Sequence, residues 1–134
     1  MPVRKSDTLP ILTQGDIVTV RQHVRIWAQQ LGMGLVDQTK IVTAASELAR
    51  NTLDYGGGGS ALLEHVEEGA KTGLRLTFED QGPGIADIQL ALKDGYTSGG
   101  GMGMGLSGSK RLSNEFEIES TPGKGTRVTI TRWK

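Results

Sequence analysis

The chain contains no cysteine among its 134 residues. This absence excludes disulfide bonds, thiolate nucleophiles and cysteine-ligated zinc sites. Aromatic residues make up only 4% of the chain, so any core must be built from Leu, Ile, Val and Ala. No apolar run approaches the roughly 20 residues that span a membrane, and the N-terminal MPVRKSDTLP lacks the apolar segment of a signal peptide. These absences predict a soluble protein of the cytoplasm.

The chain also lacks an excess of either charge. Fifteen basic and fifteen acidic residues cancel, so no net field attracts the protein to nucleic acid or to an anionic membrane. We therefore expect neither as a partner. The length fits one domain, covering residues 1–134. Glycine is abundant instead, with 20 residues gathered in clusters.

Hydrophobic periodicity predicts two long helices. Over residues 14–31, apolar side chains recur at three- and four-residue steps up to Gly32: Ile17, Val20, Val24, Trp27 and Leu31. A second helix is predicted over residues 36–55, where YGGGG ends it. Its apolar stripe comprises Ile41, Ala44, Ala45 and Leu48.

The remaining segments predict strands and two short helices. Residues 8–13 favour an edge strand because Pro10 cannot donate to a central ladder, and residues 60–66 and 73–80 favour two further strands joined by the connection EEGAKTG. A closing hairpin is predicted for 114–121 and 126–133 around the turn PGKG. Short helices are expected within 87–93 and 106–113. Helices on one face of a mainly antiparallel mixed sheet give a two-layer α/β sandwich.

Polar residues occur where these elements predict half-buried positions. Glu47, Asn51 and Asp54 form a strip beside the apolar stripe of the second helix, which suits either a cleft or a solvated face. Asp80 is in phase with the apolar residues of its strand, and Thr126 with those of the last strand. A carboxylate that points inward needs donors. Asp80 is therefore either a ligand-binding group or a cap for the turn DQGPG.

A glycine-rich loop, SGGGMGMGL, ends where a helix is predicted to begin. Glycine allows close approach of the backbone to a ligand, and a helix N-terminus favours phosphate. The alternative interpretation is a flexible linker. The order of elements fits neither a Rossmann turn nor a P-loop, because no strand precedes the loop and no Gly-Lys-Ser/Thr ends it. The other glycine run, Gly56 to Gly59, is interpreted as a helix stop and a loose connector.

Four of these stretches together resemble the ATP-binding (Bergerat-type) domain of the GHKL superfamily, named for gyrase, Hsp90, histidine kinases and MutL. SELARN resembles its asparagine box, EDQGPGI and GGGMGMGL its two glycine boxes, and GKGTRVTI its closing segment. GDIVTVRQ, LVDQTKI, LSGSKRL and the terminal TRW extend the resemblance to the RsbT-type serine/threonine switch-protein kinases of the bacterial stressosome, which are related to anti-sigma-factor kinases. DYGGGG departs from the His-Gly or His-Ala pair of many relatives.

The resemblance implies a role for each site residue. Asp80 would accept the adenine amino group, with Thr126 in the same network, and Gly82 and Gly84 would let the chain turn closely around the nucleotide. Asn51 would ligate Mg²⁺, and Glu47 would act as general base. The loop would cover the triphosphate of ATP, with these residues: Gly99, Gly100, Gly101, Met102, Gly103, Met104, Gly105 and Leu106.

The implied function is a serine/threonine protein kinase that phosphorylates a STAS-domain regulator with Mg-ATP. The phosphate weakens the complex and frees the kinase for a second downstream regulator such as a phosphatase. Two alternatives remain. One is an anti-sigma-factor-like, nucleotide-dependent binding module with little or no phosphotransfer. The other is an ATPase that transfers the phosphoryl group to water. The lack of a long C-terminal transducer region after the domain counts against this alternative.

Overall fold

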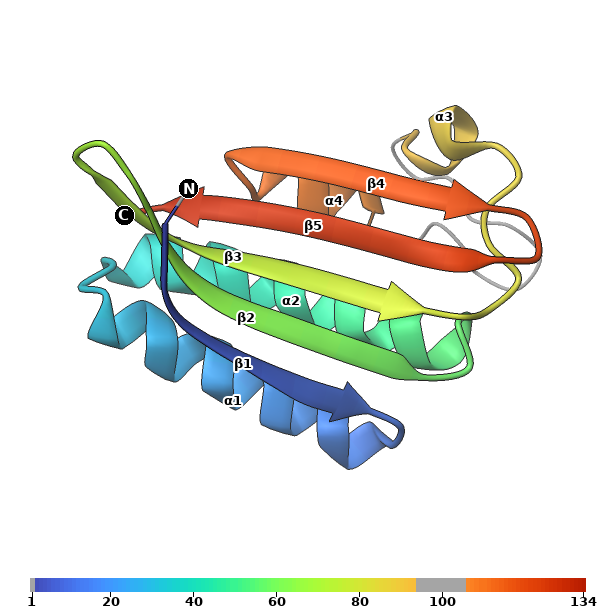
Figure 1. Cartoon of the computed structure of the whole chain (residues 1–134), viewed down its shortest axis with the longest axis horizontal. Helices are drawn as coiled ribbons and strands as arrows, with labels where there is room; N and C mark the ends of the chain where they lie inside the picture. Colours follow the sequence, from blue (N-terminus) through green and yellow to red (C-terminus); the bar gives the residue numbers. More distant parts are fainter. Residues whose placement is uncertain (1, 94–105) are drawn as a thin grey trace.

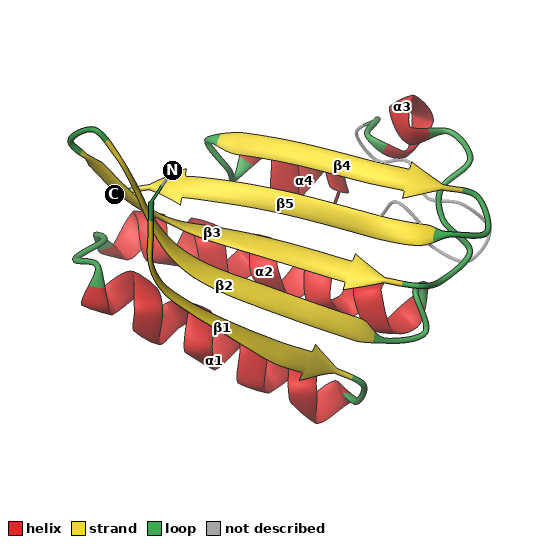
Figure 2. Cartoon of the chain, in the orientation of Figure 1, coloured by secondary structure: helices red, strands yellow, loops and turns green. Residues whose placement is uncertain are grey.

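The computed structural model describes residues 2–93 and 106–134, and it shows a five-stranded sheet with helices on one face (Figure 1). In chain order the elements are β1 (Val3–Ile11), α1 (Gln14–Gln30), α2 (Leu35–Asp54), β2 (Gly59–Glu68), β3 (Lys71–Asp80), α3 (Ile88–Ala91), α4 (Leu106–Arg111), β4 (Glu115–Thr121) and β5 (Gly125–Trp133). The predicted two-layer sandwich is confirmed, and Figure 2 shows both long helices behind the sheet.

The strand order in the sheet is β1-β2-β3-β5-β4. All four pairings are antiparallel, so the sheet predicted as mainly antiparallel and mixed is wholly antiparallel among the described strands. In this order β3 lies beside β5, and its last residue, Asp80, pairs directly with Thr126 near the start of β5. Two residues that are 46 positions apart in the chain thus meet at one end of the sheet.

The two long helices begin and end within one residue of the predicted bounds. Thr13 caps α1 in a capping box, because its hydroxyl accepts from Asp16 N at 3.2 Å while the Asp16 carboxylate accepts from Thr13 N at 3.1 Å. Both helices bury their predicted stripes against the sheet. The buried face of α2 carries the small residues Ala44, Ala45 and Ala49, which allow this helix to pack closely on the sheet.

The first three strands differ from the prediction in length. β1 begins at Val3 rather than at residue 8, because its exposed first half forms a backbone ladder with β2 without any apolar alternation. The connection between β2 and β3, predicted as EEGAKTG, consists only of Gly69 and Ala70, because Glu68 and Lys71 still form a ladder pair. At the ends of these strands the charged side chains stay in solvent although the backbone still forms ladder hydrogen bonds. A prediction from hydrophobic periodicity alone therefore makes such strands too short.

Of the shorter elements, α3 lies at the end of the sheet that carries Asp80, and α4 lies behind β4 and β5 and packs against α2 (Figure 1). The predicted helix within 87–93 is the four-residue α3, capped by the Asp87 carboxylate, which accepts from Leu90 N at 3.0 Å. α4 ends at Arg111, two residues earlier than predicted. Within the described ranges, no helix combines the length and the apolar character needed to cross a membrane.

Candidate functional site

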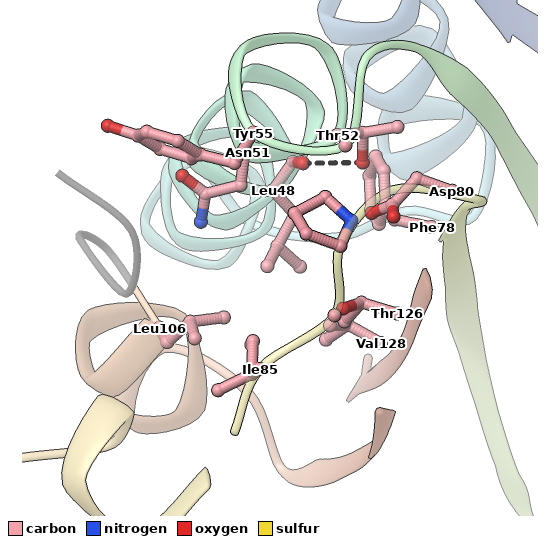
Figure 3. A pocket seen from close by; sticks show the side chains of 13 residues that line it. Leu48, Asn51, Thr52, Tyr55, Phe78, Asp80, Ile85, Leu106, Thr126 and Val128 are labelled. Atoms are coloured by element: carbon pink, nitrogen blue, oxygen red, sulfur yellow. Dashed lines mark hydrogen bonds between the residues drawn. The ribbon is translucent and has the colours of Figure 1, made fainter. Parts of the chain in front are cut away.

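A pocket of about 420 Å³, measured out to its open mouth, lies where β3 ends, β5 begins and α2 finishes (Figure 3). The lining residues come from α2, β3, β5, α4 and the segment after β3: Leu48, Asn51, Thr52, Tyr55, Gly56, Phe78, Asp80, Pro83, Gly84, Ile85, Leu106, Thr126 and Val128. Four predicted site side chains, Asn51, Asp80, Leu106 and Thr126, are therefore brought together.

The Asp80 carboxylate lies half-buried in this lining, as its strand parity predicts. Its Oδ1 accepts from Gly82 N at 2.9 Å, so the turn-capping alternative describes part of its contacts. That bond uses only one of several lone-pair positions on the two carboxylate oxygens. The remaining positions leave Asp80 able to accept a hydrogen bond from a ligand.

Burial raises the pKa of the Asp80 carboxyl above its ordinary value, although backbone hydrogen bonds from Gly82 and Thr126 oppose the rise. The neighbouring Glu79 charge raises the pKa further. Among the described residues no lysine or arginine contributes to this pKa. A partly desolvated carboxylate without a cation is costly to the fold, and a ligand that donates a hydrogen bond to its charged form lowers that cost.

The Thr126 hydroxyl belongs to a short hydrogen-bond network at the same strand tips. Ser120 Oγ lies 2.8 Å from Thr126 Oγ1, donates to Gly125 O at 3.1 Å and accepts from Ile85 N at 2.7 Å. A hydroxyl has one proton to donate, so Thr126 is the donor to Ser120. This arrangement leaves the Thr126 oxygen as an acceptor beside Asp80.

Apolar side chains form the walls around these polar groups. Leu48 of α2 and Phe78 of β3 are almost fully buried on one side, and Ile85, Leu106 and Val128 complete the lining. In Figure 3, Ile85 and Leu106 lie across the pocket from the α2 side chains. Apolar walls with two acceptors at one end suit a flat, weakly polar ring that carries a donor group.

The two predicted glycines of the first glycine box lie in close backbone contact. A Cβ at Gly82 would lie 2.7 Å from Gly56 Cα. Gly84 has φ +76°, and its Cβ would lie 2.3 Å from Thr121 O. Both positions therefore require glycine, and together they bring the segment 82–85 against the pocket.

Gly56 is a site residue that the sequence reasoning missed, since it was interpreted as part of a loose connector. In the structure, its Cβ would lie 2.3 Å from Asp80 Cγ and 2.6 Å from Asp80 Oδ2. The absence of a side chain at Gly56 thus makes the space in which the carboxylate lies. The backbone is tight at Gly59 as well, where a Cβ would lie 1.9 Å from Glu79 O.

We expect Gly56→Ala to weaken ligand binding in this pocket by about tenfold or more, because its methyl group must displace the Asp80 carboxylate from its position. Gly34→Ala is the matched control, since a Cβ at Gly34 meets nothing within 4 Å and its φ is −68°. Calorimetric titration of both variants measures the effect. Equal affinity in the Gly56 and Gly34 variants would show that the carboxylate position does not matter for binding.

Asn51 and Glu47 are placed differently with respect to the pocket. Asn51 lines it from the last turns of α2, and Figure 3 shows its side chain on the same side as Tyr55. Glu47 is half-buried one turn earlier on the helix and is not among the lining residues. Asp54, the third member of the predicted strip, is exposed. The predicted residues Gly99, Gly100, Gly101, Met102, Gly103, Met104 and Gly105 lie outside the described residues.

Comparison with known proteins finds relatives over nearly the whole chain. Residues 36–134 match the model of the family described as histidine kinase-, DNA gyrase B- and HSP90-like ATPase. The chain is 48% identical over 123 residues to the serine/threonine-protein kinase RsbT of Bacillus subtilis, covering 92% of each chain. It is 32% identical over 118 residues to the anti-sigma F factor of Thermoanaerobacter sp., covering 84% of this chain and 82% of that one.

Two solved structures share the fold. The crystal structure of the RsbU and RsbW domains of Rv1364c from Mycobacterium tuberculosis aligns with a TM-score of 0.64 at 22% identity, covering all of this chain and 33% of that one. A chain of the SiaB–SiaC complex from Pseudomonas aeruginosa aligns with a TM-score of 0.56 at 14% identity, covering 98% of this chain and 91% of that one. At these identities the likeness concerns the fold alone.

Proposed function

Because the chain belongs to the histidine kinase-, DNA gyrase B- and HSP90-like ATPase family, we propose that its pocket binds the adenine ring of ATP. The observation that carries this proposal is the half-buried Asp80 carboxylate beside the Thr126 hydroxyl, set among apolar walls. Adenine presents an exocyclic amino donor where guanine presents a carbonyl oxygen. A carboxylate at this position therefore favours adenine over guanine.

The chain is an ATP-dependent serine/threonine-protein kinase, as its high identity to one over most of both chains shows. Such a kinase must place the γ-phosphoryl group in line with the attacking hydroxyl and stabilise its charge. With adenine at Asp80, the triphosphate extends along the last turns of α2 toward Asn51. We propose that Glu47, one turn earlier, accepts the proton of the attacking hydroxyl.

Magnesium fits the residues present at Asn51. The described residues contain no group of three or more His, Cys, Asp or Glu side chains that could hold a metal ion by themselves. Mg²⁺ commonly takes only one or two protein oxygens and completes its shell with phosphate and water. We propose the Asn51 side-chain oxygen as that protein ligand. When bound, the ion would neutralise developing charge on the phosphate oxygens.

We propose that the protein acceptor is a hydroxyl on a STAS-domain regulator, and that phosphorylation releases the kinase to a second regulator in stress signalling. The similarity to RsbT and to anti-sigma F factors supports this assignment. A new phosphate carries about −1.5 to −2 charges, and its repulsion from neighbouring acidic groups would weaken the complex. The similarity to anti-sigma F factors also favours a second candidate, a nucleotide-dependent binding module that transfers little phosphate.

Transfer from γ-labelled ATP distinguishes these candidates. The purified chain is incubated with Mg²⁺, labelled ATP and a purified STAS-domain protein. A kinase places label on a serine or threonine of that protein, and Asn51→Ala or Asp80→Asn reduces the label. Stable binding of the STAS protein without label would favour the binding module, and free phosphate without labelled protein would favour an ATPase.

A further inference from the structure

The face of the sheet that points away from the helices is uncovered and strongly polar. It faces the viewer in Figure 1, with α1 and α2 behind the strands. Between β2, β3, β5 and β4 this face is hollowed by about 760 Å³, measured out to its open mouth. We name it the outer sheet face. Thr77 and Thr129 line its floor, with their hydroxyl oxygens 3.4 Å apart.

Carboxylates outnumber cations on the outer sheet face. Glu115, Glu117 and Glu119 occur at alternate positions of β4, where they pair in register with Thr131, Thr129 and Arg127 of β5. Glu64 of β2 and Glu79 of β3 add two more carboxylates. Two guanidinium groups oppose these five carboxylates, and the Lys71 ammonium adds a third cation at the edge of the face. The face of a chain with no net charge therefore carries a formal excess of two negative charges.

Both arginines of the face are already paired. Arg75 Nε donates to Glu64 Oε1 at 2.9 Å, and Arg127 Nη2 donates to Glu119 Oε2 at 2.9 Å. The hydrogen bond with Glu64 raises the pKa of Arg75 above its ordinary value against the effect of burial, and Glu117 and Glu115 raise it further. Both guanidinium groups are therefore already occupied. In the row of Glu115, Glu117 and Glu119 on β4, which we name the acidic row, only Glu119 forms an ion pair with an arginine of the face.

The acidic row is held in place at one end by Trp133. Its Nε1 donates to Glu115 Oε2 at 2.9 Å. Its ring lies against Gly73, where a Cβ would be 2.7 Å from the ring. The Lys71 ammonium lies 5.5 Å from the centroid of the same ring, so this end of the face already receives one cation from the chain itself.

We propose that the outer sheet face is a docking surface for a basic, lysine- or arginine-rich segment of a protein partner. Charge complementarity selects this occupant, since ammonium or guanidinium groups would pair with the carboxylates that β4 leaves in excess. A nucleic acid or another anion is repelled by the same charges. A second copy of this chain would double the acidic excess. Because the face lies opposite the helices, docking there leaves the mouth of the nucleotide pocket open.

The proposal is tested by titrating the intact chain with octalysine peptide and monitoring the amide chemical shifts of the chain. Shifts are expected at 115–119, 127–131 and 75–77, and octaglutamate should produce none. Glu115→Gln with Glu117→Gln should raise the dissociation constant for octalysine about fivefold, since each screened surface charge contributes a fraction of a kcal/mol. The variant leaves both arginine pairs intact, and the glutamine introduced at position 115 keeps an oxygen for Trp133.

Asp7→Asn with Asp54→Asn is the matched control, because it removes two exposed carboxylates that lie on β1 and α2, outside this face. It should change octalysine affinity by less than about twofold. Equal weakening by both double variants, or shifts spread over α1 and α2, would overturn the proposal. Self-association of the wild-type chain that the Glu115/Glu117 variant abolishes would assign the face to a second copy instead.

Discussion

Asp80→Asn is expected to weaken ATP binding by about 10- to 100-fold. A hydrogen bond to a charged group contributes about 1.5–3 kcal/mol, and each 1.4 kcal/mol corresponds to roughly a factor of ten in affinity. Asparagine keeps the shape of the carboxylate but loses its charge, and its amide nitrogen offers a donor where the adenine amino group also donates. Calorimetric titration with ATP measures the loss. Asp7→Asn, the same change at an exposed position on β1, should bind ATP as the wild type does.

The same substitution should leave the unliganded fold at least as stable at neutral pH. The pKa of Asp80 is raised in the folded state. At pH values between its ordinary pKa and its raised pKa, the folded chain therefore binds more protons than the unfolded chain. The free energy of unfolding therefore falls as pH rises through that window, and the cost is fully present above it. Asparagine removes that cost. Unchanged ATP affinity would contradict the assignment of Asp80 to ligand binding. A fall of several degrees in melting temperature would contradict the expected gain in stability and show that the turn-capping bond from Gly82 outweighs the cost of burial.

Glu47→Gln is expected to reduce phosphotransfer by about 10²- to 10⁴-fold, the usual contribution of a general base. ATP affinity should change by less than about twofold, because Glu47 is not among the residues that line the pocket. Single-turnover transfer from labelled ATP to the STAS protein measures the rate, and calorimetry measures affinity. Glu47→Ala should show the same split between rate and affinity.

Asp54→Asn is the matched control for Glu47, since it removes a carboxylate from the same helix, one turn beyond Asn51. It is exposed and should transfer phosphate at the wild-type rate. A transfer rate in Glu47→Gln equal to that of the wild type would remove Glu47 from the mechanism. A parallel loss of ATP affinity would instead make it a binding residue.

The parts of the site that depend on periodicity could be predicted from the sequence. Strand parity places Asp80 and Thr126 on the inward side of their strands, and angular position places Asn51 beside the buried stripe of its helix. Both methods work because the side chains of regular elements repeat at fixed periods. Parity says nothing about which strands are neighbours, so the register of β3 with β5, which brings Asp80 opposite Thr126, becomes visible only in the folded sheet.

Gly56 shows what the sequence could not predict. A run of four glycines is equally consistent with a loose connector and with close contact between backbones. Only the fold shows that Asp80 lies where the Gly56 side chain would be. The signal available in the sequence was the position of the run, which begins five residues after Asn51 of the asparagine box. Ile85 was missed for a similar reason, because a single apolar residue after a turn has no periodicity.

The account rests on the Asp80 carboxylate accepting the adenine amino group in the pocket between α2 and the tips of β3 and β5. The most direct measurement compares the affinities for ATP and for purine riboside triphosphate, which lacks that amino group, in the wild type and in Asp80→Ala. We predict that the wild type binds ATP about tenfold or more tightly than the analogue, whereas Asp80→Ala binds the two nucleotides with equal affinity. The same preference for ATP in both proteins would contradict the account.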